Sequence, residues 1–220
     1  MGGSSGFPID LVLFGMIAAF LVLRLRGILG RRTGYERPPA AYQPPAAAAR
    51  GPIIEARAET ASATRPVPDP ASPTGQALAH MQALDHKLNP AGFLGGAEQA
   101  FRLIVTAFAA ADRATLRTLL SAETFSAFDA AIAAREAAGH TQHSEIRAIP
   151  AATIEAAELR GNIASITVRF VSDQISFTSD ASQNPVAGTD AVTEITDLWT
   201  FERDLTSPDP TWRLVSARSA

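Results

Sequence analysis

The longest apolar stretch of the chain is the unbroken run Leu11–Leu23 near the N-terminus (LVLFGMIAAFLVL). A helix that crosses a bilayer needs about 20 predominantly apolar residues. The run reaches that length when the flanking residues join it, because a helix over residues 8–29 is roughly 33 Å long. The proline-rich segment that follows shows no apolar periodicity, so it offers no folded domain against which a buried helix would pack. The pattern therefore predicts a transmembrane anchor.

The basic residues beside this run indicate its orientation. Arg24, Arg26, Arg31 and Arg32 follow the run, and no basic residue precedes it. A cleaved secretory signal has the opposite order, with its basic residues before the apolar run. Arginine and lysine mark the cytoplasmic side of a membrane helix. We therefore expect an uncleaved anchor over residues 1–34, single-pass, with the C-terminal body in the cytoplasm.

Residues 35–73 differ in composition from everything else in the chain. They hold nine prolines and long alanine runs, without apolar periodicity. Such a segment is typical of a disordered, semi-stiff linker. Beyond it, Leu78, Met81, Leu84 and Leu88 recur every three or four residues, which predicts a short helix within residues 74–89, with Thr74 near its N-cap. This helix packs on the body, lies on the membrane or covers a pocket. Its single basic residue favours packing, because a membrane-surface helix usually carries several.

The first part of the body has the periodicity of helices. One stripe starts at Ala97, and Asp112 and Ser121 are placed to cap two further helices. The third helix is expected to end before Gly139. The apolar stripes of the three helices comprise, in order, Ala97, Phe101, Ile104, Val105 and Phe108; Leu116, Leu119 and Leu120; and Phe125, Phe128 and Ile132.

After Gly139 the pattern changes to that of strands. Ile154 lies in a predicted strand, and residues 163–178 are rich in alternating β-branched and aromatic residues. We expect a turn at 160–162, a loop over 179–191, a strand over 192–203, a turn at 207–210 and a last strand over 211–217. Helices followed by antiparallel strands predict an α+β domain over residues 74–220. About four strands curved around a helical layer form a cone that can enclose an apolar cavity.

Composition and charge narrow the function. The net charge of −3 divides into +3 for residues 1–32, 0 for 33–92 and −6 for 93–220. A nucleic-acid-binding protein normally carries a basic excess, so we expect no nucleic-acid partner. The absence of cysteine excludes disulfides, cysteine-ligated metal sites and a cysteine nucleophile.

Three stretches together resemble one protein family. They are LVLRLRGILGRRTGYERPP in the head, FLGGAEQAFRLIVTAFAAADRATLRTLLSAETFSAFDAAIAAREAAG at the start of the body, and ITDLWTFERDLTSPDPTWRLVSA at its end. They resemble the TimA family of alphaproteobacteria, relatives of the C-terminal domain of mitochondrial inner-membrane translocase subunit forty-four, the import-motor anchor. The resemblance implies a cone of the nuclear-transport-factor and ketosteroid-isomerase type. It also implies a membrane-associated adaptor without enzymatic activity, with a hydrophobic pocket between helices and sheet. An anchor and a linker stand here in place of the mitochondrial N-terminal region.

Few residues are suited to catalysis. The two tyrosines, Tyr35 and Tyr42, lie in the linker, so they cannot act as oxyanion donors in the body. The spacing of Glu136, His140 and His143 permits a metal site only loosely, because Gly139 is expected to end the helix between them. The run 199–204 is expected to be a core strand whose Arg203 pairs with a neighbouring acid. We therefore predict no catalytic residue, no cofactor and no metal.

The aromatic residues of the body are the stronger functional candidates. They are numerous for a domain of this size, and most are expected to fill the core. Our hypothesis is that a cone with so many aromatics can still leave a cavity for an acyl chain. The candidate pocket consists of Phe101, Ile104, Phe108, Phe125, Phe128, Phe170, Trp199, Phe201 and Trp212.

The combined prediction is a non-enzymatic adaptor at the bacterial inner membrane. It would contact the lipid bilayer through its N-terminal helix and hold a membrane or translocation protein through its body. A carrier or sensor of a lipid or hydrophobic ligand is the first alternative, and a cone-fold enzyme is the second. An apolar cavity would favour the carrier, and acidic or histidine side chains converging inside the cone would favour the enzyme.

Overall fold

The computed structural model describes residues 66–220. The helices of this part are α2 (Pro73–Leu84), α3 (Pro90–Ala109), α4 (Arg113–Leu119) and α5 (Ala122–Ala137). The strands are β1 (Thr141–Arg160), β2 (Ile163–Ser179), β3 (Pro185–Asp204) and β4 (Arg213–Ser219). Within residues 66–220, no helix is both long enough and apolar enough to cross a membrane. The predicted anchor, its four arginines and most of the predicted linker lie outside the described residues.

Local side-chain chemistry sets the helix starts. The carboxylate of Asp112 accepts a hydrogen bond from the Thr115 N–H at 3.1 Å, and the Ser121 hydroxyl accepts one from the Thr124 N–H at 3.2 Å. These contacts satisfy backbone donors that have no partner inside α4 and α5. Both caps were predicted and are confirmed. Gly139, at φ +67°, follows the end of α5, as expected from its position.

The short helix before the body differs from its prediction. Its N-cap is Ser72, not Thr74, since the Ser72 hydroxyl accepts from the Gly75 N–H at 3.0 Å. α2 ends at Leu84, which is 49% exposed, whereas Leu88 is buried in the connection that follows. The helix stops early because Asn89 and Pro90 start α3, so the chain has to turn between the two helices.

The sheet is antiparallel throughout, with the strand order β1-β2-β3-β4. β1 starts soon after Gly139, where the pattern predicts strands to begin. β3 starts at Pro185, earlier than predicted, so the predicted loop over 179–191 is wrong for most of its length. Its turn-forming residues close only the short turn at 180–184, where the Asp180 carboxylate accepts from the Ser182 and Asn184 N–H groups at 2.8 and 2.9 Å.

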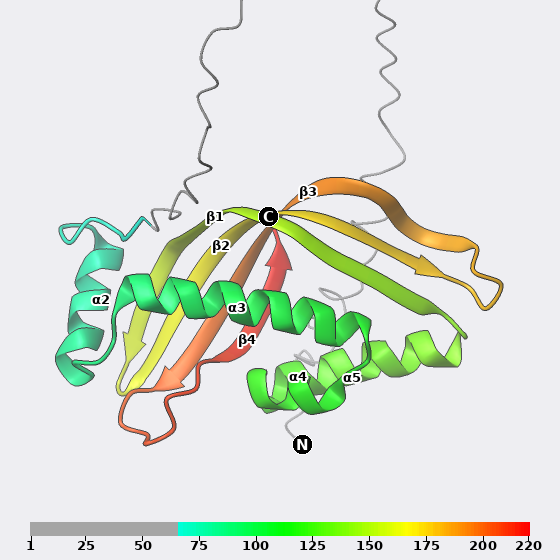
Figure 1. The fold of residues 1–220 in the computed structure, drawn as a ribbon. Coiled ribbons are helices and arrows are strands. Elements are labelled where there is room, and N and C mark those ends of the chain that lie inside the picture. The colour runs from blue at the N-terminus through cyan, green and yellow to red at the C-terminus, as the bar shows by residue number, and fades with distance from the viewer. Residues whose placement is uncertain (1–65) are drawn as a thin grey trace, which may run out of the picture.

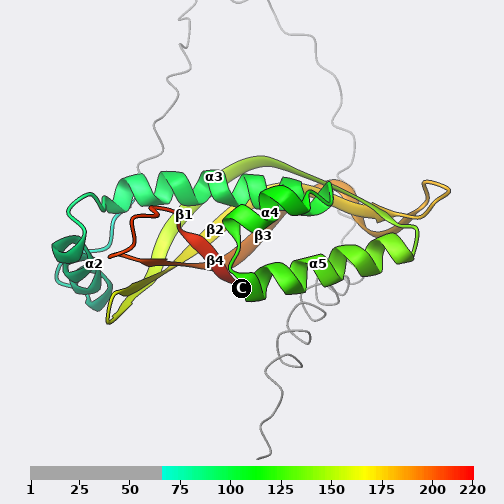
Figure 2. The ribbon, with the colours of Figure 1, turned by 90° about the horizontal axis from the view of Figure 1, so that it is seen from below.

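The helices cover one face of the curved sheet. α3 lies across its concave side with α4 and α5, while α2 stands at one end (Figure 1). The view from below shows α3 and α5 on this side with the strands behind them (Figure 2). Every second residue of the first half of β2 points into the layer between helices and sheet: Ala164, Ile166, Val168 and Phe170 are all buried. The domain is α+β, with helices on a curved four-stranded antiparallel sheet.

Candidate functional site

Most of the predicted pocket residues pack against one another. The Phe101 ring stacks on Phe170 at a centroid distance of 4.5 Å and meets Trp199 edge-on at 4.6 Å. Trp199 lies 6.3 Å from Phe201, and Ile104 is fully buried in the same core. These spacings are those of favourable aromatic pairs. This group therefore joins α3 to the middle of the sheet as a packed core.

The remaining aromatics of the set lie in three other places. Trp212 contacts Phe93 at 4.8 Å, and Phe93 links it to Phe201. Phe108 and Phe128 form a separate pair at 5.1 Å between α3 and α5. Phe125 lies beneath the guanidinium of Arg117 at 4.7 Å. Phe108, Phe125 and Phe128 are only partly buried. The predicted pocket residues thus belong to one packed core or lie partly buried against it.

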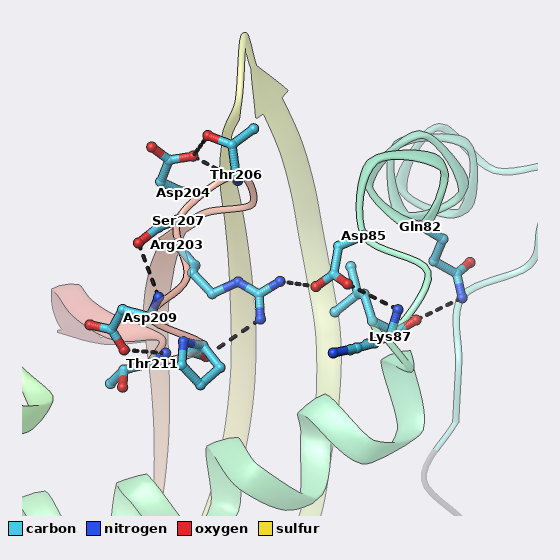
Figure 3. A network of polar contacts seen from close by, with 11 residues as sticks. Gln82, Asp85, Lys87, Arg203, Asp204, Thr206, Ser207, Asp209 and Thr211 are labelled. Atoms are coloured by element: carbon cyan, nitrogen blue, oxygen red, sulfur yellow. Dashed lines mark hydrogen bonds and ion pairs between the residues drawn. The ribbon is translucent and has the colours of Figure 1, made fainter.

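Arg203 is the centre of a polar network at the α2 end of the domain (Figure 3). Its guanidinium forms an ion pair with Asp85, and its Nη1 donates to the Pro210 carbonyl at 3.4 Å. The guanidinium carbon also lies 5.2 Å from the centre of the Trp212 ring. The side chains of Arg203 and Asp85 are only 12% and 17% exposed. One arginine of β3 therefore holds both the α2–α3 connection and the β3–β4 turn.

Asp85 occupies the C-cap position of α2 and is itself held in place. Its carboxylate accepts a hydrogen bond from the Lys87 N–H at 2.9 Å. This backbone hydrogen bond, and then the hydrogen bond from Arg203, lower the pKa of the Asp85 carboxyl below its usual value. Gln82 adds a contact in the same connection by donating to the Leu88 carbonyl at 3.0 Å. The predicted pairing of Arg203 with an acid is confirmed, but the acid comes from a distant helix end.

A second arginine fastens the opposite end of the helical layer. Nη2 of Arg135 donates to the carbonyls of Phe108 and Ala109 at 2.8 and 3.2 Å, at the end of α3, and Nη1 donates to Gln142 of β1. Carbonyls at a helix C-terminus favour a cation. Burial lowers the pKa of Arg135, but the side chain stays charged. Arg135 therefore ties α3, α5 and β1 together.

Other charged side chains of the domain surface form ion pairs. Arg113 of α4 pairs with Asp129 and Glu136 of α5 at 2.6 and 2.8 Å, and its hydrogen bonds lower the pKa of Glu136. Arg169 pairs with Glu155 across the outer face of the sheet at 3.0 Å. Glu136 is thus engaged by an arginine. Among residues 66–220, no group of three histidine or acidic side chains is arranged to hold a metal ion.

Polar side chains also lie on the inner face of the sheet, and the sequence analysis missed them. Ser172 and Gln174 continue the inward positions of β2 beyond Phe170, and both are buried. Gln174 donates to the Ser172 hydroxyl at 2.7 Å. Asp197 stands opposite Phe170 on the same face and accepts from the Ser219 hydroxyl at 3.3 Å. Strict alternation along β2 and β3 is the signal that would have found them.

Comparison with protein families gives a match over most of the chain. A family model described as "Tim44-like domain" matches residues 74–219. No curated protein matches the sequence significantly. Among solved structures, the intermembrane-space region of the chloroplast protein ARC6 is similar, with 12% identity and a TM-score of 0.42. That match covers 56% of this chain and 93% of the ARC6 chain.

Proposed function

The chain belongs to the Tim44-like family, and on this premise we propose that it is a membrane-tethered adaptor without enzymatic activity. In this proposal residues 1–34 anchor it in the bacterial inner membrane, residues 35–73 set its reach, and the domain over 74–220 holds a membrane or translocation protein from the cytoplasmic side. Confinement by an anchor raises the local concentration of a bound partner without any new contact.

One combination of features carries the proposal. The apolar run Leu11–Leu23, with four arginines directly after it, precedes a domain of a family named for a translocase subunit. The domain itself is acidic, with −6 over residues 93–220. An anionic bilayer repels such a surface, so attachment through a separate basic anchor is physically favourable.

The polar groups of the interior support a role without catalysis. The buried polar side chains of the described residues include one carboxylate, Asp197, and no histidine. General acid–base catalysis needs a titratable group whose pKa and partner are matched to a reacting substrate. Asp197 lies beside a packed aromatic core and a serine hydroxyl instead. We therefore place the function on the outer surfaces of the domain.

Membrane fractionation tests the anchor. Deleting residues 1–34 should move the protein from the membrane pellet to the supernatant, while the full chain stays in the pellet after a high-salt wash. A matched control replaces Arg24, Arg26, Arg31 and Arg32 with alanine. This variant should stay in the pellet, but part of it should insert in the opposite orientation. Protease added from the cytoplasmic side should then cleave the domain in only a fraction of the molecules. If the deletion variant pellets as the full chain does, the anchor proposal is wrong.

A second candidate function, carriage of a lipid or hydrophobic ligand, rests on Phe108, Phe125 and Phe128. These three rings, from α3 and α5, are partly buried and pack against the core that contains Phe101. Native mass spectrometry of the full chain, released from mild detergent, tests it. A bound species that disappears with Phe128→Ala, but persists with the exposed-site control Leu103→Ala, would favour the carrier over the adaptor.

A further inference from the structure

The end of the sheet farthest from α2 leaves one strand open on its outer side. β4 pairs with β3 only from Asp197 to Glu202, and its last contact is the hydrogen bond from the Ala220 N–H to the Thr196 carbonyl at 3.0 Å. Among the described residues, no strand pairs with the rest of β3 on that side. This part of the strand extends past α3 in Figure 1. We call Val192–Thr196, directly beside the end of β4, the β3 edge.

The backbone of the β3 edge is oriented to accept another strand. Backbone groups of alternate residues in an antiparallel strand point to the same side. Because the Thr196 carbonyl points away from β2, the N–H and C=O of Glu194 point the same way, toward the open side. Unpaired strand edges bind extended peptides through such groups.

A bulge ends the β3 edge on its other side. Asp190, Ala191 and Val192 together oppose the single residue Ile175 of β2, between the pairs Gln174–Thr193 and Ser176–Thr189. The Thr189 hydroxyl accepts from the Ala191 N–H at 3.1 Å, which holds the bulge in shape. Val192 is 57% exposed there. The bulge thus limits pairing to a short segment and presents an apolar side chain next to it.

The two charged side chains that face each other at the β3 edge are both acidic. Asp173 of β2 stands directly opposite Glu194, so two carboxylates share the outer face of the sheet at neighbouring positions. Like charges in this arrangement destabilise a strand pair. Residues 170–202 contain no lysine or arginine. Three arginines of the sheet, Arg147, Arg169 and Arg203, pair with Glu145, Glu155 and Asp85. Exposed Arg218 of β4 stands opposite Leu198, beside the β3 edge.

These observations favour one kind of occupant. We propose that the β3 edge binds an extended, basic segment of a partner protein, which adds a short strand beside Glu194. A lysine or arginine of that segment pairs with Glu194 and Asp173 and relieves their repulsion, and an apolar residue covers Val192. A second copy of this chain would bring further carboxylates to the same place, so charge disfavours it. Acidic residues and a bulge alone would also protect an edge from aggregation, but protection does not require an exposed valine beside them.

Peptide binding to the full chain, reconstituted in detergent or nanodiscs, tests this inference. The probe is a fluorescent peptide of three Lys-Val repeats, and two controls isolate its features. Glu-Val repeats reverse its charge, and Lys-Pro repeats keep the charge but lack every second donor and hold the backbone in polyproline II conformation, which disfavours strand pairing. Fluorescence anisotropy should show binding of the Lys-Val peptide that weakens with salt. Both control peptides should bind at least about tenfold more weakly. Equal binding of the Lys-Pro peptide would mean a simple charge effect and would overturn strand addition.

Variants of the chain locate the binding. Asp173→Asn with Glu194→Gln should weaken Lys-Val binding by roughly five- to thirtyfold. The same two substitutions should raise the unfolding temperature, because they remove the repulsion between the carboxylates. A variant that binds less because it is unfolded would not show this rise. Glu123→Gln with Glu158→Gln makes the same charge change elsewhere and should alter binding less than about twofold. If both pairs weaken binding equally, or neither does, the β3 edge is not the site.

A second copy is the remaining outcome of the test. Sedimentation that shows a dimer of the full chain, dissociated by Val192→Pro, would identify the occupant as another copy and overturn the proposal. The inference rests on the adaptor function only in taking the partner to be a protein. Fractionation after deletion of residues 1–34 and peptide binding are separate measurements, so either proposal can fail without the other.

Discussion

The contact between Asp85 and Arg203 should control how firmly α2 is held on the domain. We consider Asp85→Asn, which removes the charge but leaves an amide oxygen that can accept from the Lys87 N–H. Arg203 keeps its contacts with the Pro210 carbonyl and the Trp212 ring in this variant. The change therefore isolates one charge-assisted hydrogen bond between α2 and β3.

The size of the effect follows from the burial of the pair. A hydrogen bond to a charged group contributes about 1.5–3 kcal/mol to stability when it is well formed and shielded. Both side chains retain slight contact with solvent, at 12% and 17% exposure, which weakens the interaction. We therefore expect Asp85→Asn to cost about 1–2 kcal/mol of stability, toward the lower end of that range. This loss corresponds to a roughly five- to thirtyfold increase in local opening.

Hydrogen–deuterium exchange of the full chain measures that opening directly. Peptides from Pro73–Leu84 should exchange faster in Asp85→Asn, while peptides from the middle of β2 keep their protection. Arg203→Met also removes the contacts with the Pro210 carbonyl and the Trp212 ring, so its effect should be at least as large. The double variant should exceed Arg203→Met only slightly, because both changes remove the contact with Asp85. Glu158→Gln, which breaks an exposed ion pair with Arg160, serves as the control and should leave α2 unchanged.

Two results would refute this reasoning. One is additive single effects, with a coupling energy below about 0.3 kcal/mol, which would mean that the two residues act independently. The other is an equal rise in exchange over the whole domain, which would mean that the pair supports global folding and not the position of α2.

Three further predictions concern the core, a glycine and acid. Phe101→Ala should lower the free energy of unfolding by about 3–5 kcal/mol because the ring is fully buried, whereas Leu103→Ala, at a 53% exposed position, should change it little. Gly188→Ala should destabilise the β2–β3 pairing by about 1–3 kcal/mol, since φ is +80° and a Cβ would lie 2.2 Å from the Ser176 carbonyl oxygen. Gly96→Ala, where a Cβ meets open space on α3, should stabilise the domain slightly. The pKa of Asp85 is lowered in the folded chain, so the stabilisation it provides is present above its ordinary pKa and is lost as pH falls through the lowered value. In acid, the protection of α2 from exchange should therefore decline relative to the rest of the domain, and Asp85→Asn should remove that difference.

Sequence reasoning succeeded where the cause of a structure is local. Asp112 and Ser121 cap helices through backbone groups three residues away, so their position beside an apolar stripe was sufficient. The alternation in residues 163–178 likewise located β2, because its inward face is apolar over the first half. The family resemblance was also confirmed over nearly the whole body.

It failed where the determining contact is distant in sequence. The start of β3 looked like a loop because Asn184, Pro185 and Gly188 are turn-forming types, and only pairing with β2 makes it a strand. The inward polar pair Ser172–Gln174 broke the apolar pattern of β2, which obscured the face it shares with Phe170. Apolar periodicity reports on a single helix or strand, whereas the start of β3 and the inward polar side chains of β2 depend on how two strands pair.

The α2 end of the domain joins the two parts of the proposed function. If residues 35–73 are the tether, any pull from the membrane reaches the domain at Ser72, where α2 begins. α2 is fixed at its other end by Asp85, whose partner Arg203 lies in the sheet and holds the β3–β4 turn as well. A tensile load would therefore pass into β3 and β4 through this ion pair, as well as into the core through the buried Leu78 and Met81 of α2. The β3 edge lies at the far end of the same strand, so α2 can be strained or even detached without disturbing a partner bound there. Peptide binding should accordingly be the same in Asp85→Asn and in the unaltered chain, although α2 exchanges faster in the variant; weaker binding in this variant would show that the two ends of β3 are coupled.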